Sequence, residues 1–247
     1  PRSGDILALA NFPNYDLNES ALRPVDAIRD RAINDFFEPG SVFKIVTASA
    51  VLEENVVKLD DKFDCENGEW KIGKRVLHDH TPHGILTFKE IIERSSNVGT
   101  VKSASRLGPA KMCKYTRAFG FYDKTGVDLP GEGVGMNGDT SRWSKVSMYA
   151  IPMGQEVTTT AMQLACAISA IANNGFLVKP RVVKDVVDSN GNIVREEPAR
   201  VLKKGIRSQT AAKMRSIRKG AVETGTGKKA KVEDWDVGGK TGTAQKV

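Results

Sequence analysis

The sequence predicts a domain of the α+β class, in which a lobe built on an antiparallel sheet is interrupted by a mostly helical lobe. Helix-like spacing and helix caps fill the middle of the chain. Segments rich in β-branched residues and a hairpin turn lie towards its C-terminal end. We expect a single domain over residues 1–247, with the sheet lobe at about 1–40 and 176–247 and the helical lobe at about 41–175.

The composition is that of a folded protein with a modestly basic surface. Hydrophobic residues make up 40% of the chain and charged residues 27%, which suits a substantial core and argues against a disordered chain. The formal charge of +7 comes without a basic run interleaved with aromatic residues, so we do not expect nucleic-acid binding. No stretch approaches the roughly 18 apolar residues of a membrane span. The three cysteines (Cys65, Cys113 and Cys166) are far apart, which favours buried structural thiols over a disulfide framework or a zinc site.

A short strand and a long connection are expected before the first helix. Residues 6–10 are apolar and lie between turn-forming residues, which predicts a strand. Residues 14–38 are polar and irregular, which predicts a surface connection. Pro39-Gly40 then introduces a helix over about residues 41–54, and its apolar positions predict that this helix is mostly buried.

Capping sequences mark the helices of the middle region. Thr87 and Glu90 have the spacing of a capping box, so a helix should begin near residue 88 and reach a turn at Ser95. Further helices are expected over about residues 98–107 and 110–119. Thr160 and Gln163 form a second capping box, and the helix that they open should end at residues 173–175.

The C-terminal part of the chain predicts strands around one more helix. Residues 176–187 are β-rich, and Ser189-Asn190-Gly191-Asn192 predicts a hairpin turn. Residues 208–222 predict a helix, and residues 237–246 predict a glycine-rich strand.

Three short motifs carry the candidate chemistry. They are Ser41-Val42-Phe43-Lys44, then Ser95-Ser96-Asn97, then Lys240-Thr241-Gly242-Thr243. Each is weak alone, because an S-x-x-K pattern is expected about once by chance in a chain of this length. The chain indeed holds a second S-x-x-K at residues 216–219 and a second K-T-G at residues 124–126.

The first motif is distinguished by its position at the start of a predicted buried helix. Lys44 follows Ser41 by three residues, which places an amine beside a hydroxyl on one helix face. Burial would lower the pKa of Lys44 and make it a usable base. Ser216 lies in a Lys/Arg-rich segment where Lys219 should be solvated, so we interpret this second S-x-x-K as structural.

The other two motifs depend more strongly on context. In a strand, a period of two would place Lys240 and Gly242 on one face and Thr241 and Thr243 on the other. Glycine there lets the backbone approach a substrate closely. The second K-T-G is followed by a loop composition and is interpreted as structural. Ser95 and Asn97 lie at a helix end, where they could project into a cleft or merely cap a turn.

Taken together and in this order, the motifs match the set found in β-lactamases and penicillin-binding proteins. The sequence resembles the transpeptidase domain of class B, monofunctional penicillin-binding proteins. Beyond the motifs the resemblance extends along nearly the whole chain, and it includes residues 4–10, 38–44, 94–99, 126–132, 154–165 and 239–244. It implies the penicillin-binding protein/serine β-lactamase-like fold, with a sheet lobe flanked by helices plus a helical lobe.

The resemblance implies a D,D-transpeptidase that crosslinks peptidoglycan stem peptides through an acyl-enzyme on Ser41 and is acylated by β-lactams. It gives Lys44 the role of base, Ser95 that of proton relay and Asn97 that of substrate amide binder. The carboxylate-binding positions fall on Lys240, Thr241, Gly242 and Thr243, and the oxyanion hole on the N–H groups of Ser41 and Thr243. It implies no metal and no organic cofactor.

Other functions remain as alternatives. A serine β-lactamase or a non-hydrolysing β-lactam sensor would share the three motifs, although no E-x-x-L-N segment lies between the second and third. A non-catalytic cell-wall scaffold is not expected to keep all three. The cluster around His78, His80 and His83 invites a metal site, but we favour a polar loop near the cleft. Trp143 and Tyr149 could line the groove or pack in the core.

The resemblance also carries expectations about the rest of the protein. In that family two further strands and a helix follow the K-T-G strand, and an N-terminal membrane anchor and a pedestal domain precede the transpeptidase domain. We therefore expect this chain to be a piece of a longer extracytoplasmic protein. Its partners would be a glycosyltransferase and membrane proteins of the divisome or elongasome. We also expect the chain to acylate more poorly than one extended through those strands.

Overall fold

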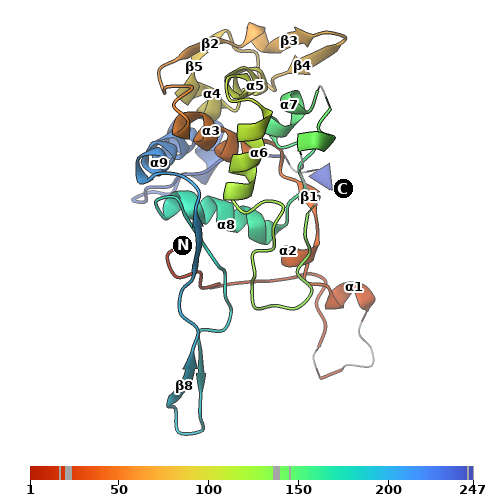
Figure 1. Ribbon diagram of the computed structural model, residues 1–247, viewed down its shortest axis with the longest axis vertical. Coiled ribbons are helices and arrows are strands. Elements are labelled where there is room, and N and C mark those ends of the chain that lie inside the picture. The colour runs from red at the N-terminus through yellow and green to blue at the C-terminus, as the bar shows by residue number, and fades with distance from the viewer. Residues whose placement is uncertain (17, 20–23, 136–139, 145, 244, 247) are drawn as a thin grey trace.

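The computed structural model describes residues 1–16, 18–19, 24–135, 140–144, 146–243 and 245–246 (Figure 1). Within these residues helices form most of the body, and short strands lie at its edges. The helices are α1 (Val25–Ile28), α2 (Arg31–Asn34), α3 (Lys44–Glu53), α4 (Phe88–Arg94), α5 (Asn97–Ser105), α6 (Pro109–Ala118), α7 (Ser147–Ala150), α8 (Ala161–Ala172) and α9 (Ser208–Glu223). The strands are β1 (Phe37–Glu38), β2 (Lys62–Asp64), β3 (Glu69–Ile72), β4 (Arg75–His78), β5 (Ile85–Thr87), β6 (Phe176–Val178), β7 (Asp185–Val187), β8 (Ile193–Glu196), β9 (Val201–Lys204) and β10 (Gln245–Lys246).

The core is built around α3. The residues of this helix from Lys44 to Leu52 are all buried, as expected for a helix that is enclosed on every side. Helices α5, α6 and α9 pack against it. Phe43, just before α3, packs edge-on against Phe121 with 5.1 Å between the ring centroids. The prediction of a mostly buried helix after Pro39-Gly40 is confirmed, although its first turn is a 3₁₀ helix over Gly40–Phe43.

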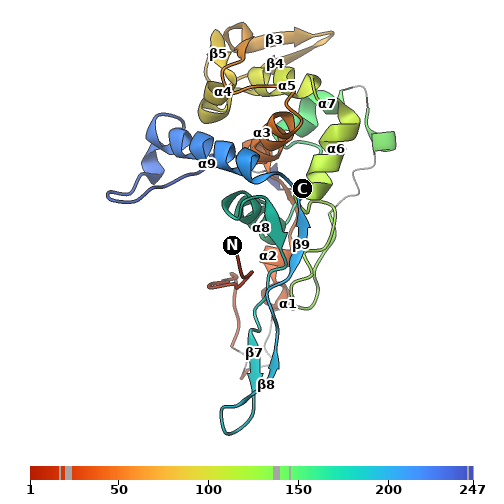
Figure 2. The same cartoon turned by 60° about the vertical axis from the view of Figure 1, so that its left-hand side comes forward.

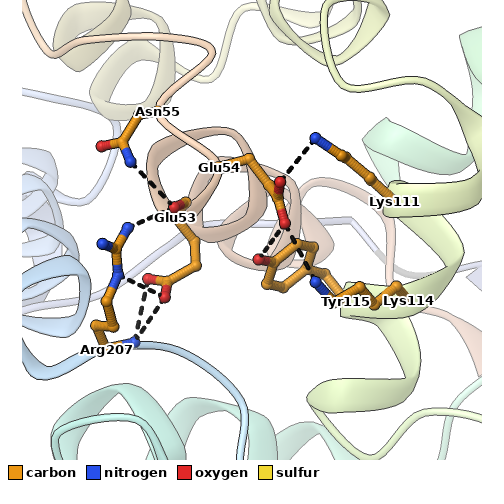
Figure 3. Close-up of polar contacts among 7 residues, drawn as sticks. All are labelled: Glu53, Glu54, Asn55, Lys111, Lys114, Tyr115 and Arg207. Carbon is orange, nitrogen blue, oxygen red and sulfur yellow. Dashed lines mark hydrogen bonds and ion pairs between the residues drawn. The ribbon is translucent and has the colours of Figure 1, made fainter.

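The C-terminal end of α3 is clamped by ion pairs to two other helices (Figure 3). Glu54 lies 2.7 Å from Lys111 of α6 and accepts a 2.7 Å hydrogen bond from the Tyr115 hydroxyl. Glu53 accepts hydrogen bonds from the Arg207 backbone N–H at 3.1 Å and from its Nε at 2.8 Å, just before α9. Negative charge at this end of a helix is opposed by the helix dipole, and the cations offset that cost.

Local capping signals determine where the next helices begin. The Thr87 side chain accepts from the Glu90 N–H at the start of α4, and the Glu90 carboxylate reaches back to the Thr87 N–H at 3.0 Å. Thr160 and Gln163 make the same reciprocal arrangement at the start of α8. Both predicted capping boxes are confirmed.

The strands pair as two-stranded antiparallel ladders among the described residues, namely β1–β10, β2–β5, β3–β4, β6–β9 and β7–β8. Hairpin β7–β8 extends from the helical body as an arm (Figures 1 and 2). Its turn lies at residues 188–192, where Gly191 adopts a φ of 85°, so the predicted hairpin is confirmed. The α+β class is confirmed as well, whereas the division into two lobes stays a prediction.

Three local predictions are wrong. Residues 6–10 are not a strand, since the bridge of Asp5 with Arg181 is the one pairing of this segment among the described residues, and Leu7 is 96% exposed. Among the described residues of 237–246, β10 alone is a strand, with β1 as its partner. Residues 14–38 are not wholly irregular, because they include α1, α2 and β1. An apolar or glycine-rich run favours extended backbone, but a strand also needs a hydrogen-bonding partner, which a local pattern does not reveal.

None of the helices in the described ranges combines the length and the apolar character needed to span a membrane.

Candidate active site

The Ser41 turn is fixed by close backbone contacts from distant segments. Gly40 adopts a φ of 55°, and a Cβ atom at this position would overlap the carbonyl oxygen of Thr243. Its N–H donates to the Gly154 carbonyl at 3.0 Å. A Cβ atom at Gly242 would come within 2.5 Å of the Val42 side chain and 2.9 Å of its backbone N. The first and third motifs are therefore held side by side, as their proposed joint action on one substrate requires.

Ser95 lies at the centre of the polar cluster. It ends α4 in the left-handed conformation, with a φ of 63°. Its Oγ accepts hydrogen bonds from Lys44 Nζ at 3.3 Å and from Lys240 Nζ at 2.8 Å. These two donors occupy the lone pairs of the hydroxyl, so its proton remains available to an acceptor in the cleft.

Lys44 is fully buried, and its Nζ has three hydrogen-bond acceptors. Its Nζ donates to the Ser95 carbonyl at 2.7 Å and to Asn97 Oδ1 at 2.7 Å, besides the Ser95 hydroxyl. Burial holds the pKa of Lys44 well below its usual range, the nearby Lys240 ammonium lowers it further, and the Asp79 carboxylate raises it. Lys44 thus joins the second motif to α3. No hydrogen bond links its Nζ to Ser41 Oγ within the part of the chain that the structure describes.

The third motif contributes both a cation and a wall of the cleft. Burial lowers the pKa of Lys240 to about 8, and its Nζ also donates to the Thr241 carbonyl at 2.9 Å. Thr241, Gly242 and Thr243 all line one cleft with Ser41, Ser95 and Asn97. The alternation expected of a strand would have separated Gly242 from the two threonines. Instead the three residues line the same cleft, because residues 241–243 belong to no strand among the described residues.

The cleft has a volume of about 310 Å³ and includes four residues that the motif analysis did not select: His80, Thr81, Arg94 and Thr226. Thr226 follows α9, and its hydroxyl lies 2.6 Å from that of Thr241. His80 follows β4 and belongs to the histidine cluster that was predicted to form a polar loop near the cleft. A larger hollow of about 680 Å³ lies beside the β7–β8 arm, but no Ser, Thr or Cys lines it among the described residues.

The turn after β4 holds the second motif in place. Asp79 accepts hydrogen bonds from the Asn97 N–H, from the Val98 N–H at 2.9 Å and from Ser96 Oγ at 2.6 Å. The His78 carbonyl accepts from Asn97 Nδ2 at 2.7 Å. Sequence reasoning missed Asp79, because it lies 17 residues before Ser96 and no local spacing links the two.

The duplicate motifs occupy structural positions, as predicted. Ser216 is exposed on α9, and Lys219 lies 2.6 Å from Asp236, which raises the pKa of that lysine. This shift is opposite in direction to that of Lys44. Thr125 of the second K-T-G donates its backbone N–H to Glu132 at 2.6 Å, within a surface loop.

The remaining candidates are the metal site, the two aromatic residues and the cysteines. No group of three or more His, Cys, Asp or Glu side chains in the described ranges is placed to hold a metal ion. Tyr149 packs edge-on against Trp70 with 6.0 Å between the ring centroids, and Trp143 packs against the core. Cys65 is buried, and no disulfide joins any two of the three cysteines, all of which lie in the described ranges.

Comparison with known proteins gives consistent matches along the chain. The family described as "Penicillin binding protein transpeptidase domain" matches residues 1–247. Stage V sporulation protein D of Bacillus subtilis is 36% identical over 251 residues, which cover 100% of this chain and 39% of that protein. The probable peptidoglycan D,D-transpeptidase PbpC of Pseudomonas aeruginosa is 30% identical, with 100% of this chain and 42% of that protein covered.

A solved structure shares the fold as well. Penicillin-binding protein 3 of Mycobacterium tuberculosis in complex with ampicillin superposes with a TM-score of 0.85 at 33% identity, over 93% of this chain and 52% of that one. The chain therefore spans about two fifths of the length of the curated relatives named above.

Proposed function

The chain belongs to the family of penicillin-binding protein transpeptidase domains, and from this membership we propose that it is a serine D,D-transpeptidase that crosslinks peptidoglycan stem peptides. The observation that carries the proposal is the position of the Ser95 hydroxyl. It accepts hydrogen bonds from the two lysines of the other motifs, in a cleft that Ser41 also lines. Two serine hydroxyls in one cleft, with a buried lysine hydrogen-bonded to one of them, suit acyl transfer without a metal or an organic cofactor.

In the first step, Ser41 Oγ attacks the carbonyl between two terminal D-alanines. Lys44 accepts the Ser41 proton, a role supported by the burial that lowers the pKa of Lys44. The C–N bond then breaks, and the leaving D-alanine amine takes its proton from the Ser95 hydroxyl. The donors that Lys44 and Lys240 direct at Ser95 Oγ stabilise the negative charge that develops there.

The negative oxygen of the tetrahedral intermediate needs hydrogen-bond donors in place beforehand. The backbone N–H groups of Ser41 and Thr243 are the proposed pair, and the close packing of Gly40 against Thr243 supports this assignment. Each such donor is typically worth about 3 kcal/mol of transition-state stabilisation.

The substrate is held by residues of the second and third motifs. The terminal carboxylate is proposed to bind Lys240, Thr241, Gly242 and Thr243, and the substrate amide is proposed to bind Asn97. Only one of the two hydrogens of Asn97 Nδ2 is used, in the bond to the His78 carbonyl.

In the second step, an amine from a neighbouring strand attacks the acyl-enzyme carbonyl and gives up a proton to the Ser95 oxygen, which restores that hydroxyl. The bond to Ser41 Oγ breaks, Lys44 returns its proton to Ser41, and a peptide crosslink forms. A β-lactam would acylate Ser41 in the same way, but its leaving group stays attached and blocks the approach of the amine. M. tuberculosis penicillin-binding protein 3, whose structure was solved with ampicillin, supports this part of the proposal.

The cellular setting follows from the substrate. Peptidoglycan crosslinks form outside the cytoplasmic membrane, so we propose an extracytoplasmic site of action on a protein that an N-terminal membrane helix anchors. Glycosyltransferases and divisome or elongasome membrane proteins are the proposed partners, since they supply and position the glycan strands.

The test combines a fluorescent penicillin with a peptide ending in D-Ala-D-Ala and an amine acceptor. We expect a single adduct by intact mass that persists for many minutes, together with amine-dependent exchange of the terminal D-alanine. Ser41→Ala should abolish both, and Ser216→Ala, in the duplicate motif, should change neither. Rapid penicillin hydrolysis would instead establish a serine β-lactamase. A stable adduct without exchange would establish a β-lactam sensor. If neither this chain nor a chain extended through the two further strands formed an adduct, the acyl-transferase assignment would be refuted.

A further inference from the structure

We propose that Asp79 is a positioning residue for acyl transfer, whose carboxylate fixes the second motif and sets the charge balance around Lys44. The inference deepens the proposed function of the same site and rests on it for the kinetic consequence. The geometric and electrostatic parts concern Asp79, Asn97 and Lys44 alone.

Asp79 meets the start of α5 with both carboxylate oxygens. Its Oδ1 accepts from two consecutive backbone N–H groups, those of Asn97 and Val98, and its Oδ2 accepts from Ser96 Oγ at 2.6 Å. The first N–H groups of a helix have no partner within the helix, and the helix dipole favours negative charge there. Asp79 satisfies two of these groups, those of Asn97 and Val98, from a turn that lies 18 and 19 residues earlier in the sequence.

This anchoring determines which way the Asn97 side chain faces. Asp79 holds the Asn97 backbone, and the neighbouring His78 carbonyl accepts from Nδ2 at 2.7 Å. With its amide nitrogen fixed, Asn97 presents Oδ1 to Lys44 Nζ at 2.7 Å. A chain of contacts thus runs from the turn after β4, through the second motif, to the buried lysine.

The same carboxylate acts on Lys44 through its charge. Two charged groups act on Lys44 from the segments around it: the Lys240 ammonium from the third motif and the Asp79 carboxylate from the turn after β4. Burial and Lys240 lower the pKa of Lys44, and Asp79 opposes them. Two other charged residues, Lys102 of α5 and Asp64 of β2, lie in the same region as Asp79. All three charges affect the pKa of the Cys65 thiol. Loss of the Asp79 charge would therefore let Lys44 release its proton at a lower pH.

The decisive variant is Asp79→Asn, because it removes the charge and keeps the shape. The asparagine Oδ1 can still accept from the two backbone N–H groups, and its Nδ2 can donate to Ser96 Oγ once that hydroxyl rotates. Asp128→Asn is the matched control. Asp128 also accepts from two consecutive backbone N–H groups, those of Val182 at 2.7 Å and Val183 at 2.8 Å, and no charge effect of Asp128 on Lys44 is found.

Two readouts separate the charge effect from a general structural effect. The first is the rate of Ser41 acylation by a fluorescent penicillin between pH 5 and 9. The fall of this rate at the acid end of the range, its acid limb, reports protonation of the base Lys44. The second is NMR titration of the lysine Nζ and Cε shifts in isotopically labelled protein, with Lys44→Met to assign Lys44. The NMR titration needs no activity, so it tests the inference even if wild-type protein fails to acylate and the proposed function falls.

In Asp79→Asn we expect the Lys44 titration and the acid limb to move to lower pH by about half a unit or more. The alkaline limb should stay in place, because burial alone shifts Lys240. Asp79→Glu keeps the charge, so it should keep the titration near that of wild type while it slows the maximal rate. If Asp79→Asn does not fold, Asp79→Ser removes the charge with another side chain that accepts from helix N–H groups. An unchanged Lys44 titration in the charge-free variant, or an equal shift in Asp128→Asn, would overturn the proposal.

Discussion

Replacing Glu54 by glutamine is expected to destabilise the protein, because this carboxylate connects the end of α3 to α6. Figure 3 shows Glu54 at the end of α3, facing Lys111, Lys114 and Tyr115. The carboxylate lies 2.7 Å from Lys111 and 3.2 Å from Lys114, and it accepts a 2.7 Å hydrogen bond from the Tyr115 hydroxyl. The bonds to Lys111 and Tyr115 are the main causes that lower the pKa of Glu54 from 4.5 to about 2.

The size of the effect follows from that shift and from solvent exposure. A difference between 4.5 and about 2 corresponds to roughly 3 kcal/mol, at about 1.4 kcal/mol per pKa unit. The side chains of Lys111 and Lys114 are 47% and 65% exposed, so solvent screens their share. Glutamine also keeps an oxygen that can accept from Tyr115. We therefore expect Glu54→Gln to lower the free energy of unfolding by about 2 kcal/mol at pH 7.

The pH dependence provides a second signature. Because folding depresses the pKa of Glu54, its stabilising contribution is fully present above pH 4.5 and is lost as the pH falls towards 2. Urea unfolding of wild-type and variant protein between pH 7 and pH 3 measures this difference. The gap between the two should narrow steadily below about pH 5.

The matched control is Glu223→Gln on α9. Glu223 lies 3.8 Å from Lys219, and its side chain is 51% exposed, so its removal should cost less than about 0.5 kcal/mol. Equal losses at the two positions, or a Glu54→Gln gap that stays constant with pH, would refute the view that charge at the end of α3 stabilises the fold.

Three further outcomes follow from other features of the structure. Gly242→Ala should slow penicillin acylation at least tenfold, because the new Cβ would lie 2.5 Å from the Val42 side chain. Gly84→Ala, whose Cβ would make an ordinary 3.7 Å contact, should not slow it, and equal rates in the two variants would contradict the close approach of Gly242 to Val42. Acylation should decline above about pH 8 as Lys240 loses its proton, and Lys240→Arg should remove this decline; its persistence in that variant would assign it to another group. Thr87→Ala should lower the free energy of unfolding by about 1–2 kcal/mol in urea titrations, because it breaks a capping box, and an unchanged midpoint would show that the cap contributes nothing.

The parts of the fold that sequence could predict are those that local chemistry determines. The capping boxes at Thr87 and Thr160 and the turn at residues 188–192 each depend on side chains within a few positions, and each is confirmed. Strands depend on partners that lie elsewhere in the chain. Residues 6–10 have the composition of a strand but lack a partner strand. Among the described residues, the pairing of this segment is limited to the bridge of Asp5 with Arg181.

The same distinction applies to the candidate site. Motif order was enough to select Ser41, Lys44, Ser95 and Lys240, and the structure brings the last three into direct hydrogen bonds. The residues that surround the motifs could not be predicted from local spacing. Asp79, for example, contacts the second motif because the fold brings the turn after β4 next to it. The duplicate S-x-x-K shows why burial matters, since Lys219 is paired with Asp236 at the surface while Lys44 is enclosed.

The cleft closes between segments that are far apart along the chain. The hydrogen bond from Lys240 to Ser95 spans 145 residues, and Gly239 donates to the Arg218 carbonyl at 3.0 Å. A large loop must close before contacts of such long range contribute any stability, so we expect them to form late. In that case the chain would bind a penicillin only after the long-range contacts had formed, at the end of folding. A drug bound covalently to Ser41 and in contact with Thr241 and Thr243 would connect the first and third motifs. It should therefore slow hydrogen exchange in the segment of the third motif.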